Sequence, residues 1–236
     1  MKKIGLYFLA TLFLVQCGEL QEVVNQLPGS GIGDSQIAAG LKEALEKGID
    51  RQVTTLMTEG GFYNQADVRI LLPDELKKVD ETLRKIGLSN LADEGIRMLN
   101  RAAEEAVKEA KPVFVQAIKE MTFEDARKIL MGDQTAATEY LRRKNRDELY
   151  QKFYPVVQNS FQKVGADQIW NEIISRYNQI PFVQPVNTDL NDYVTRKALE
   201  GVYKKIAEEE KHIRTDIHAR TTDLLKQVFA LQDKKQ

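Results

Sequence analysis

Two ionisable residues on the last long helical stretch, Lys205 and Glu209, have the types and spacing that acid–base chemistry needs. At a helical advance of about 100° per residue, Glu209 lies about 20° and Lys205 about 60° from Val202, which is on the apolar side. A carboxylate on an apolar face must find a partner, or its pKa rises until it is neutral. We favour a simple i,i+4 ion pair at a helix end; the alternative is a polar pocket lined by Glu209, Lys205 and His212.

Three further polar residues are candidates for the same pocket. Asn100 lies at the edge of the apolar arc of the stretch 91–121, where its amide can bind a neighbouring helix end or a ligand. Arg101, next to it, belongs to a charged face whose local pairs contribute only a few tenths of a kcal/mol each. Arg196 is near the start of the last long helix, where the helix dipole opposes a cation, so we expect it to meet a carboxylate from another helix or an anionic ligand.

Metal and cofactor chemistry has little support in the sequence. The two histidines, His212 and His218, are six residues apart, and no HExxH motif or Cys/His pairing occurs. No GxSxG, P-loop or dinucleotide-binding fingerprint is present, and the glycines of 29–33 follow no strand. We therefore predict no metal and no cofactor. A hydrolase with Glu209 as general base remains the enzyme alternative.

The composition restricts the class of protein. The chain has 236 residues, 42% of them hydrophobic, which suits one globular domain with a proper core. The formal net charge is −1 and both signs are mixed along the chain, which argues against a nucleic-acid partner.

The single cysteine, Cys17, lies in the most informative short motif. Lys2 and Lys3 precede an apolar run over 4–15, which is too short to span a bilayer but suits the core of a signal peptide. The run ends in LVQCG (14–18), which resembles a bacterial lipobox, although Gln16 departs from the small residue usual before the cysteine. The motif predicts a lipid on Cys17, membrane anchoring through that lipid, and a place in the bacterial cell envelope facing the periplasm.

The domain organisation follows from this motif. We predict a lipoprotein-type signal peptide over 1–16, a flexible Gly- and Pro-containing tether over 17–34, and one all-α domain of about eight or nine helices over 35–236.

The stretch 91–121 is expected to be the central helix of this domain. Ala102, Ala106 and Ala110 recur every four residues, so another helix can approach closely. Pro112 predicts a kink or break, because it cannot donate to the carbonyl four residues back.

Helix boundaries elsewhere follow from capping residues and glycines. Ser89 is the expected cap of the central helix, Thr122 starts a capping-box helix, and Asn145 is expected to cap a helix that is disturbed at Pro155. The stretch 62–72 does not fit a helix and is expected to be extended across the helices. Together with 181–192, it is where a cleft is expected.

Several stretches resemble a known bacterial family: ALEKGIDRQV at 44–53, VRILLP at 68–73, LNRAAEEAV at 99–107, MTFEDARKIL at 121–130, GDQTAATEYL at 132–141, and DYVTRKALEGVY with AEEE between 192 and 210. With them the chain is similar to the domain of unknown function 4197 family over about 37–229. The resemblance implies an envelope protein, often a lipoprotein, and it transfers no activity, ligand or catalytic residue.

These observations favour a non-catalytic, lipid-anchored helical module that binds an envelope protein or a small molecule. The alternatives are the hydrolase and a structural protein that associates with itself.

Overall fold

The computed structural model describes residues 32–163, 165–185 and 189–233, except for the side chains of Glu75, Ala166 and Asp167. The residues from Asp34 onward form one compact unit. Its described part consists of helices and connecting segments without strands, which confirms the predicted all-α class. Cys17, the signal peptide and all but the end of the predicted tether lie outside the described residues.

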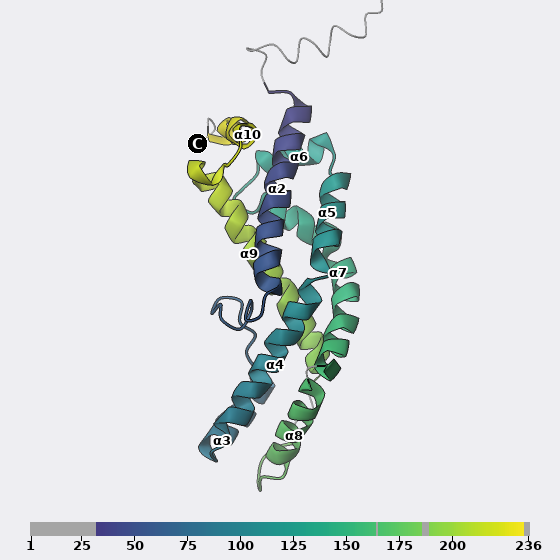
Figure 1. Ribbon diagram of the computed structural model, residues 1–236, viewed down its shortest axis with the longest axis vertical. Helices are drawn as coiled ribbons and strands as arrows, with labels where there is room; N and C mark the ends of the chain where they lie inside the picture. Colours follow the sequence, from purple (N-terminus) through teal and green to yellow (C-terminus); the bar gives the residue numbers. More distant parts are fainter. Residues whose placement is uncertain (1–31, 164, 186–188, 234–236) are drawn as a thin grey trace, which may run out of the picture. The chain divides into compact units, whose positions relative to one another are not determined.

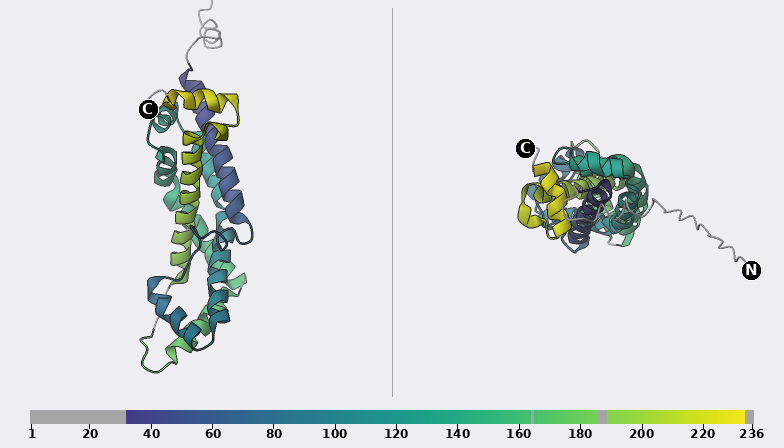
Figure 2. Two further views of the ribbon diagram at one scale, coloured as in Figure 1. Left: turned by 90° about the vertical axis from the view of Figure 1, so that its left-hand side faces the viewer. Right: turned by 90° about the horizontal axis from the view of Figure 1, so that it is seen from above.

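The helices are shown in Figure 1 and keep its labels. Their bounds are α2 (Asp34–Met57), α3 (Asp74–Lys85), α4 (Ser89–Val107), α5 (Ala110–Glu120), α6 (Phe123–Leu130), α7 (Ala136–Lys163), α8 (Ala166–Asn178), α9 (Leu190–Thr215), the 3₁₀ turn η1 (Ile217–Ala219) and α10 (Asp223–Asp233). Figure 2 shows α9 running beside α2, with α10 crossing near the start of α2 and the end of α9.

Helices α4, α7 and α9 pack against one another and form the centre of the unit. Leu99, Ala102, Ala103 and Ala106 of α4 are fully buried, so small side chains line the surface where its neighbours approach. The alanine ladder is therefore a packing feature.

The predicted central helix is broken where Pro112 requires it. Helix α4 ends at Val107 and α5 begins at Ala110. The carbonyl of Lys108 is the acceptor that Pro112 cannot serve, because proline has no N–H. The expected break is confirmed.

The start of α6 also follows the prediction. The Thr122 side chain accepts from the Asp125 N–H at 3.1 Å, and the Asp125 carboxylate accepts from the Thr122 N–H at 3.1 Å. This is a complete capping box.

Two cap predictions are wrong, those at Asn145 and at Ser89. Asn145 caps no helix: it lies inside the continuous helix α7 and donates from Nδ2 to the Val113 carbonyl at 3.3 Å. The helix also continues through Pro155. Ser89 is the first residue of α4, which begins after Leu88 without a side-chain cap.

Residues 58–73, which we call the crossing segment, connect α2 to α3 and pass between α4 and α9. Gly60 adopts φ +78°, which favours glycine, and a Cβ on Gly201 of α9 would lie 2.7 Å from the ring of Phe62. The crossing segment therefore lies closely against α9 because that position of the helix has no side chain.

Within the described ranges, none of the helices combines the length and the apolar character needed to cross a bilayer.

Candidate functional site

The structure places the five candidate pocket residues at separate positions. Asn100 is completely buried and bonds to the crossing segment. Its Oδ1 accepts from the Ile70 N–H at 2.8 Å, and its Nδ2 donates to the carbonyls of Ile70 and Ile96, each at 2.8 Å. The Asn100 amide thus bonds both the N–H and the carbonyl of Ile70, as a neighbouring strand would do. These hydrogen bonds give Asn100 a structural function.

Lys205 holds the same segment from the other side. Its Nζ lies 2.6 Å from the Asp67 carboxylate and 3.0 Å from that of Glu208, so it pairs with these residues and not with Glu209. The hydrogen bond from Lys205 is the main cause of the lowered pKa of Asp67. Tyr193 of α9 donates to the Leu71 carbonyl at 2.9 Å. Side chains from α4 and α9 therefore fix the crossing segment on both sides.

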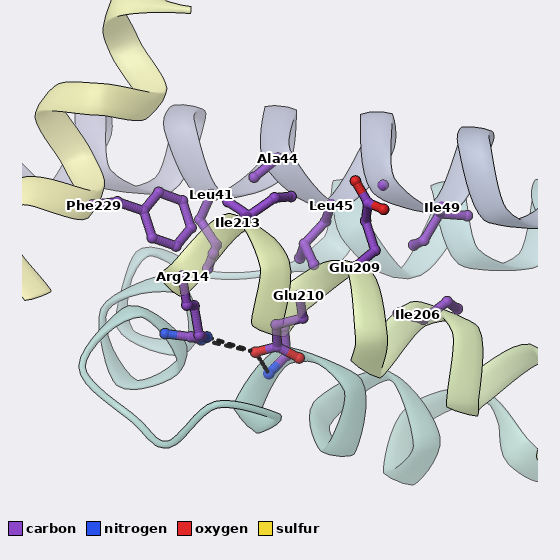
Figure 3. Close-up of a pocket in the computed structure, with 12 residues that line it drawn as sticks. Leu41, Ala44, Leu45, Ile49, Ile206, Glu209, Glu210, Ile213, Arg214 and Phe229 are labelled. Carbon is purple, nitrogen blue, oxygen red and sulfur yellow. Dashed lines mark hydrogen bonds and ion pairs between the residues drawn. The ribbon is translucent and has the colours of Figure 1, made fainter. Parts of the chain in front are cut away.

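Glu209 faces α2. It accepts from Gln52 Nε2 at 2.7 Å and lies 3.5 Å from the Arg51 guanidinium. Figure 3 shows Glu209 and the next residue, Glu210, pointing to opposite sides of α9. The cavity beside them has a volume of about 20 Å³ and mostly apolar walls, so it holds about one water molecule and no substrate.

The two arginines make exposed local contacts. Arg101 lies 3.1 Å from the Glu59 carboxylate, which is itself strongly exposed. Arg196 pairs at 2.9 Å with Asp192, one turn earlier on its own helix, and lies over the ring of Tyr150. Its carboxylate partner is therefore on α9, whereas the sequence suggested another helix or an anionic ligand.

The most deeply buried ion pair among the described residues joins Arg214 and Glu210, which were not among the candidates from the sequence. Arg214 donates to the Glu210 carboxylate from Nε at 3.0 Å and from Nη2 at 2.8 Å (Figure 3). Glu210 also accepts from the N–H groups of Ala137 and Thr138 at 2.9 and 2.8 Å, so it caps the start of α7. Arg214 donates to the last carbonyls of α6, those of Ile129 at 2.8 Å and Leu130 at 3.1 Å.

Arg220 extends this network to the C-terminal helix. It donates to the carbonyls of Ile213 and Arg214 at the end of α9, and to the Asp233 carboxylate of α10. The hydrogen bond from Arg220 is the main cause of the lowered pKa of Asp233. The network satisfies the ends of three helices, so its charges have a structural explanation.

Two hollows of the surface lie along the crossing segment. A first hollow, of about 410 Å³, lies between its beginning and α4 and is lined by Glu59, Gly60, Tyr63, Asn64, Glu94, Arg97, Met98, Arg101 and Glu104. The guanidinium carbon of Arg69 lies 3.9 Å from the centre of the Tyr63 ring, and that of Arg97 lies 5.8 Å from it.

Glu104 belongs to the wall of the first hollow and is buried. Burial is the largest cause of its raised pKa, opposed by hydrogen bonds from the N–H groups of Phe62, Gly60 and Tyr63. The bond from Phe62 measures 3.2 Å. Because the carboxylate is used by three backbone donors, it stabilises the turn after α2.

A second hollow, of about 310 Å³, lies between the crossing segment and α9. It is lined by Asp67, Val68, Arg69, Ile70, Leu71, Tyr193, Lys197, Glu200, Gly201 and Lys204. Of the candidate residues from the sequence, Arg101 lines the first hollow; Asn100 and Lys205 hold the segment that separates the hollows.

No cluster of three or more His, Cys, Asp or Glu side chains with metal-binding geometry occurs among the described residues. His212 lies 3.4 Å from Asp216, and neither residue lines a hollow described above.

Sequence reasoning missed Glu104, Arg69 and the Glu210–Arg214 pair. Glu104 falls on the charged arc of α4 and becomes buried only because the turn at Gly60–Gly61 folds over it. The i,i+4 spacing of Glu210 and Arg214 was a usable signal for an ion pair, but the burial of that pair depends on α6 and α10.

The fold and site define a helical protein with a core of α4, α7 and α9 and two polar hollows along an irregular segment. The family model described as protein of unknown function (DUF4197) matches residues 31–230, and the chain belongs to this family. Searches of curated proteins and of solved structures found no match.

Proposed function

We propose that this protein is a lipid-anchored component of the bacterial cell envelope whose periplasm-facing helical domain binds another envelope protein without catalysing a reaction. The observation that carries the anchoring is the cysteine of LVQC, placed directly after a basic start and an apolar run of signal-peptide length.

The buried charged side chains have structural partners, which supports a binding protein over an enzyme. Glu104, Glu210, Arg214 and Arg220 are buried, and each is bonded to backbone groups at a turn or a helix end. The hydrolase alternative requires Glu209 to reach a substrate, but the neighbouring cavity has room for about one water molecule. The geometry therefore gives the general-base hypothesis no support.

The first hollow supports a polypeptide partner. Its exposed arginines, Arg97 and Arg101, are paired with Glu94 and Glu59 at 3.1 Å each, and such exposed pairs exchange partners at little cost. Tyr63 and Met98 add aromatic and apolar surface. A protein segment that carries both signs of charge and an apolar side chain matches this combination.

Lipid labelling tests the anchoring. In cells grown with tritiated palmitate, the wild-type chain is expected to carry label and to sediment with membranes. Cys17→Ala is expected to carry no label, because the lipid requires the thiol. Immunoblotting establishes that both chains accumulate equally. An unlabelled wild-type chain, or equal label on the variant, would contradict the proposal.

Photo-crosslinking in cells tests the partner. A photoreactive side chain placed at the exposed Asn64, on the wall of the first hollow, is expected to give an adduct with a second protein. The same group at the exposed Gln158 of α7, outside both hollows, serves as control and is expected to give none.

The mass of the adduct decides between the interpretations. An adduct of two copies of this chain supports self-association instead of the proposed partner. No adduct at Asn64, or equal adducts at both positions, contradicts a partner in the first hollow.

A further inference from the structure

The second hollow has cationic walls that its own carboxylates neutralise only in part. It is lined by Arg69 from the crossing segment and by Lys197 and Lys204 from α9, against the carboxylates of Asp67 and Glu200. The positions 193, 197, 200, 201 and 204 follow helical spacing and form one face of α9, so the cations come from two elements that enclose the same space.

The two carboxylates are already engaged. Glu200 accepts from Lys197 at 2.7 Å, which neutralises that lysine. Asp67 lies 2.6 Å from Lys205, outside the hollow, and 3.7 Å from Lys204. Lys204 instead donates to the Asp67 carbonyl at 2.8 Å. The Asp67 carboxylate is thus shared between two lysines and lies closer to Lys205. The positive charge of Lys204 is therefore only partly neutralised.

Arg69 has a hydrogen-bond donor without a partner among the described residues. Its guanidinium stacks on Tyr63 at 3.9 Å, and it forms no ion pair with any side chain that the structure describes. Its Nε is buried and has no hydrogen-bond partner there. Buried donors are normally satisfied, and an arginine fork has five N–H groups suited to phosphate or carboxylate oxygens. The aromatic face fixes the guanidinium without using those donors.

The apolar surface of the hollow comes mainly from Leu71, which is 57% exposed although it is a large hydrophobic residue, while Val68 and Ile70 line it from almost completely buried positions. Gly201 leaves α9 without a side chain at this point. The volume of about 310 Å³ is within the range of small-molecule sites, which combine apolar walls with a few placed polar groups.

We propose that the second hollow binds an organic phosphate, with the phosphate between Arg69 and Lys204 and the organic part against Leu71. A phosphate monoester carries about two negative charges near neutral pH. These charges match Arg69, which forms no ion pair among the described residues, and Lys204, which shares the Asp67 carboxylate with Lys205. The inference goes beyond the proposed function, because it adds a small-molecule ligand in a different hollow from the one proposed for the protein partner.

Calorimetry on the purified full chain in neutral detergent tests this inference. The probes are phenyl phosphate, for a soluble ligand, and dihexanoyl phosphatidic acid below its micelle concentration, for a lipid headgroup. Binding of at least one probe with a Kd of about 1 mM or tighter is expected, and benzyl alcohol is expected not to bind. The tighter probe identifies the source of the phosphate.

Three variants locate the binding. Lys204→Gln and Arg69→Gln are each expected to raise the Kd at least about tenfold, since each removes a charge-assisted contact. Lys211→Gln, an exposed position on the same helix outside the hollow, is the matched control and is expected to bind like the wild type.

Folding and binding are separated by the choice of variants. Arg69→Gln removes the cation from Tyr63 and can destabilise the segment, whereas Lys204 is exposed, and circular dichroism verifies each fold. No binding of either probe up to about 10 mM overturns the inference, as does equal affinity in Lys204→Gln and Lys211→Gln. Either result leaves the palmitate label and the adduct at Asn64 unchanged, so the two proposals fail separately.

Discussion

Replacing Glu210 by alanine is expected to lower the free energy of unfolding by about 3–5 kcal/mol, because it leaves a buried guanidinium without its counter-charge. Arg214 has only 1% of its side chain exposed, so water cannot replace the carboxylate. The substitution also removes the acceptor of the Ala137 and Thr138 N–H groups at the start of α7. Urea denaturation followed by circular dichroism measures the change.

The control lies two residues earlier. Glu208 is about half exposed and pairs with Lys205, so Glu208→Ala is expected to change the free energy of unfolding by less than about 0.5–1 kcal/mol. A loss in Glu210→Ala no larger than this would show that the buried pair contributes no more than a surface pair.

The double variant separates the pair from its surroundings. Glu210→Leu combined with Arg214→Met removes both charges, and we expect it to destabilise less than the sum of the single changes, because neither partner remains unpaired. The combined variant still loses the caps on α6 and α7, so it remains less stable than the wild type. An additive cycle would show that the two side chains act independently.

The sequence predicts the elements whose signals are local. Pro112 breaks the central helix because of its own missing N–H, and Thr122 with Asp125 forms a capping box within four residues. The irregular stretch after Gly60–Gly61 is equally visible, since glycine punctuation and the loss of helical periodicity coincide there.

What depends on contacts between distant elements could not be predicted. Asparagine is a residue type that often caps helices, but Asn145 lies inside α7, where its side-chain amide donates to the Val113 carbonyl of α5. Lys205 and Glu209 have ideal spacing for a pair, yet Asp67 and Gln52 offer each a closer partner from another element. Helical periodicity gives the direction of a side chain and cannot identify which segment lies opposite it.

The candidate site also combines a residue with a local sequence signal and a residue whose contacts depend on distant elements. Asn100 stood out because an amide at the edge of an apolar arc needs a partner, and it has one in the backbone of Ile70. Arg69 carried no such signal, because its stacking on Tyr63 and its place beside α9 arise only in the folded chain. A cleft was expected along the non-helical stretches 62–72 and 181–192; the two hollows lie along the first stretch, and no residue of 181–192 lines either of them.

Replacing Asn100 by alanine is expected to lower the free energy of unfolding by about 2–4 kcal/mol. The N–H and carbonyl of Ile70 would both lose their partner in a site that is completely buried, and each unsatisfied group costs about 1–3 kcal/mol. Asn90→Ala, an exposed position in the first turn of the same helix, is the control and is expected to stay within about 0.5 kcal/mol of the wild type.

Hydrogen exchange distinguishes a local role of Asn100 from a general loss of stability. In Asn100→Ala, the amide of Ile70 is expected to exchange faster than amides in the centre of α7, because α7 does not depend on this side chain. Asn100→Asp retains an acceptor for the Ile70 N–H but cannot donate to either carbonyl, so it should destabilise as well. If Ile70 keeps its protection relative to α7 in the alanine variant, the part of the crossing segment around Ile70 is held by α9, through Tyr193, Lys204 and Lys205, and the bonds of Asn100 are not needed there.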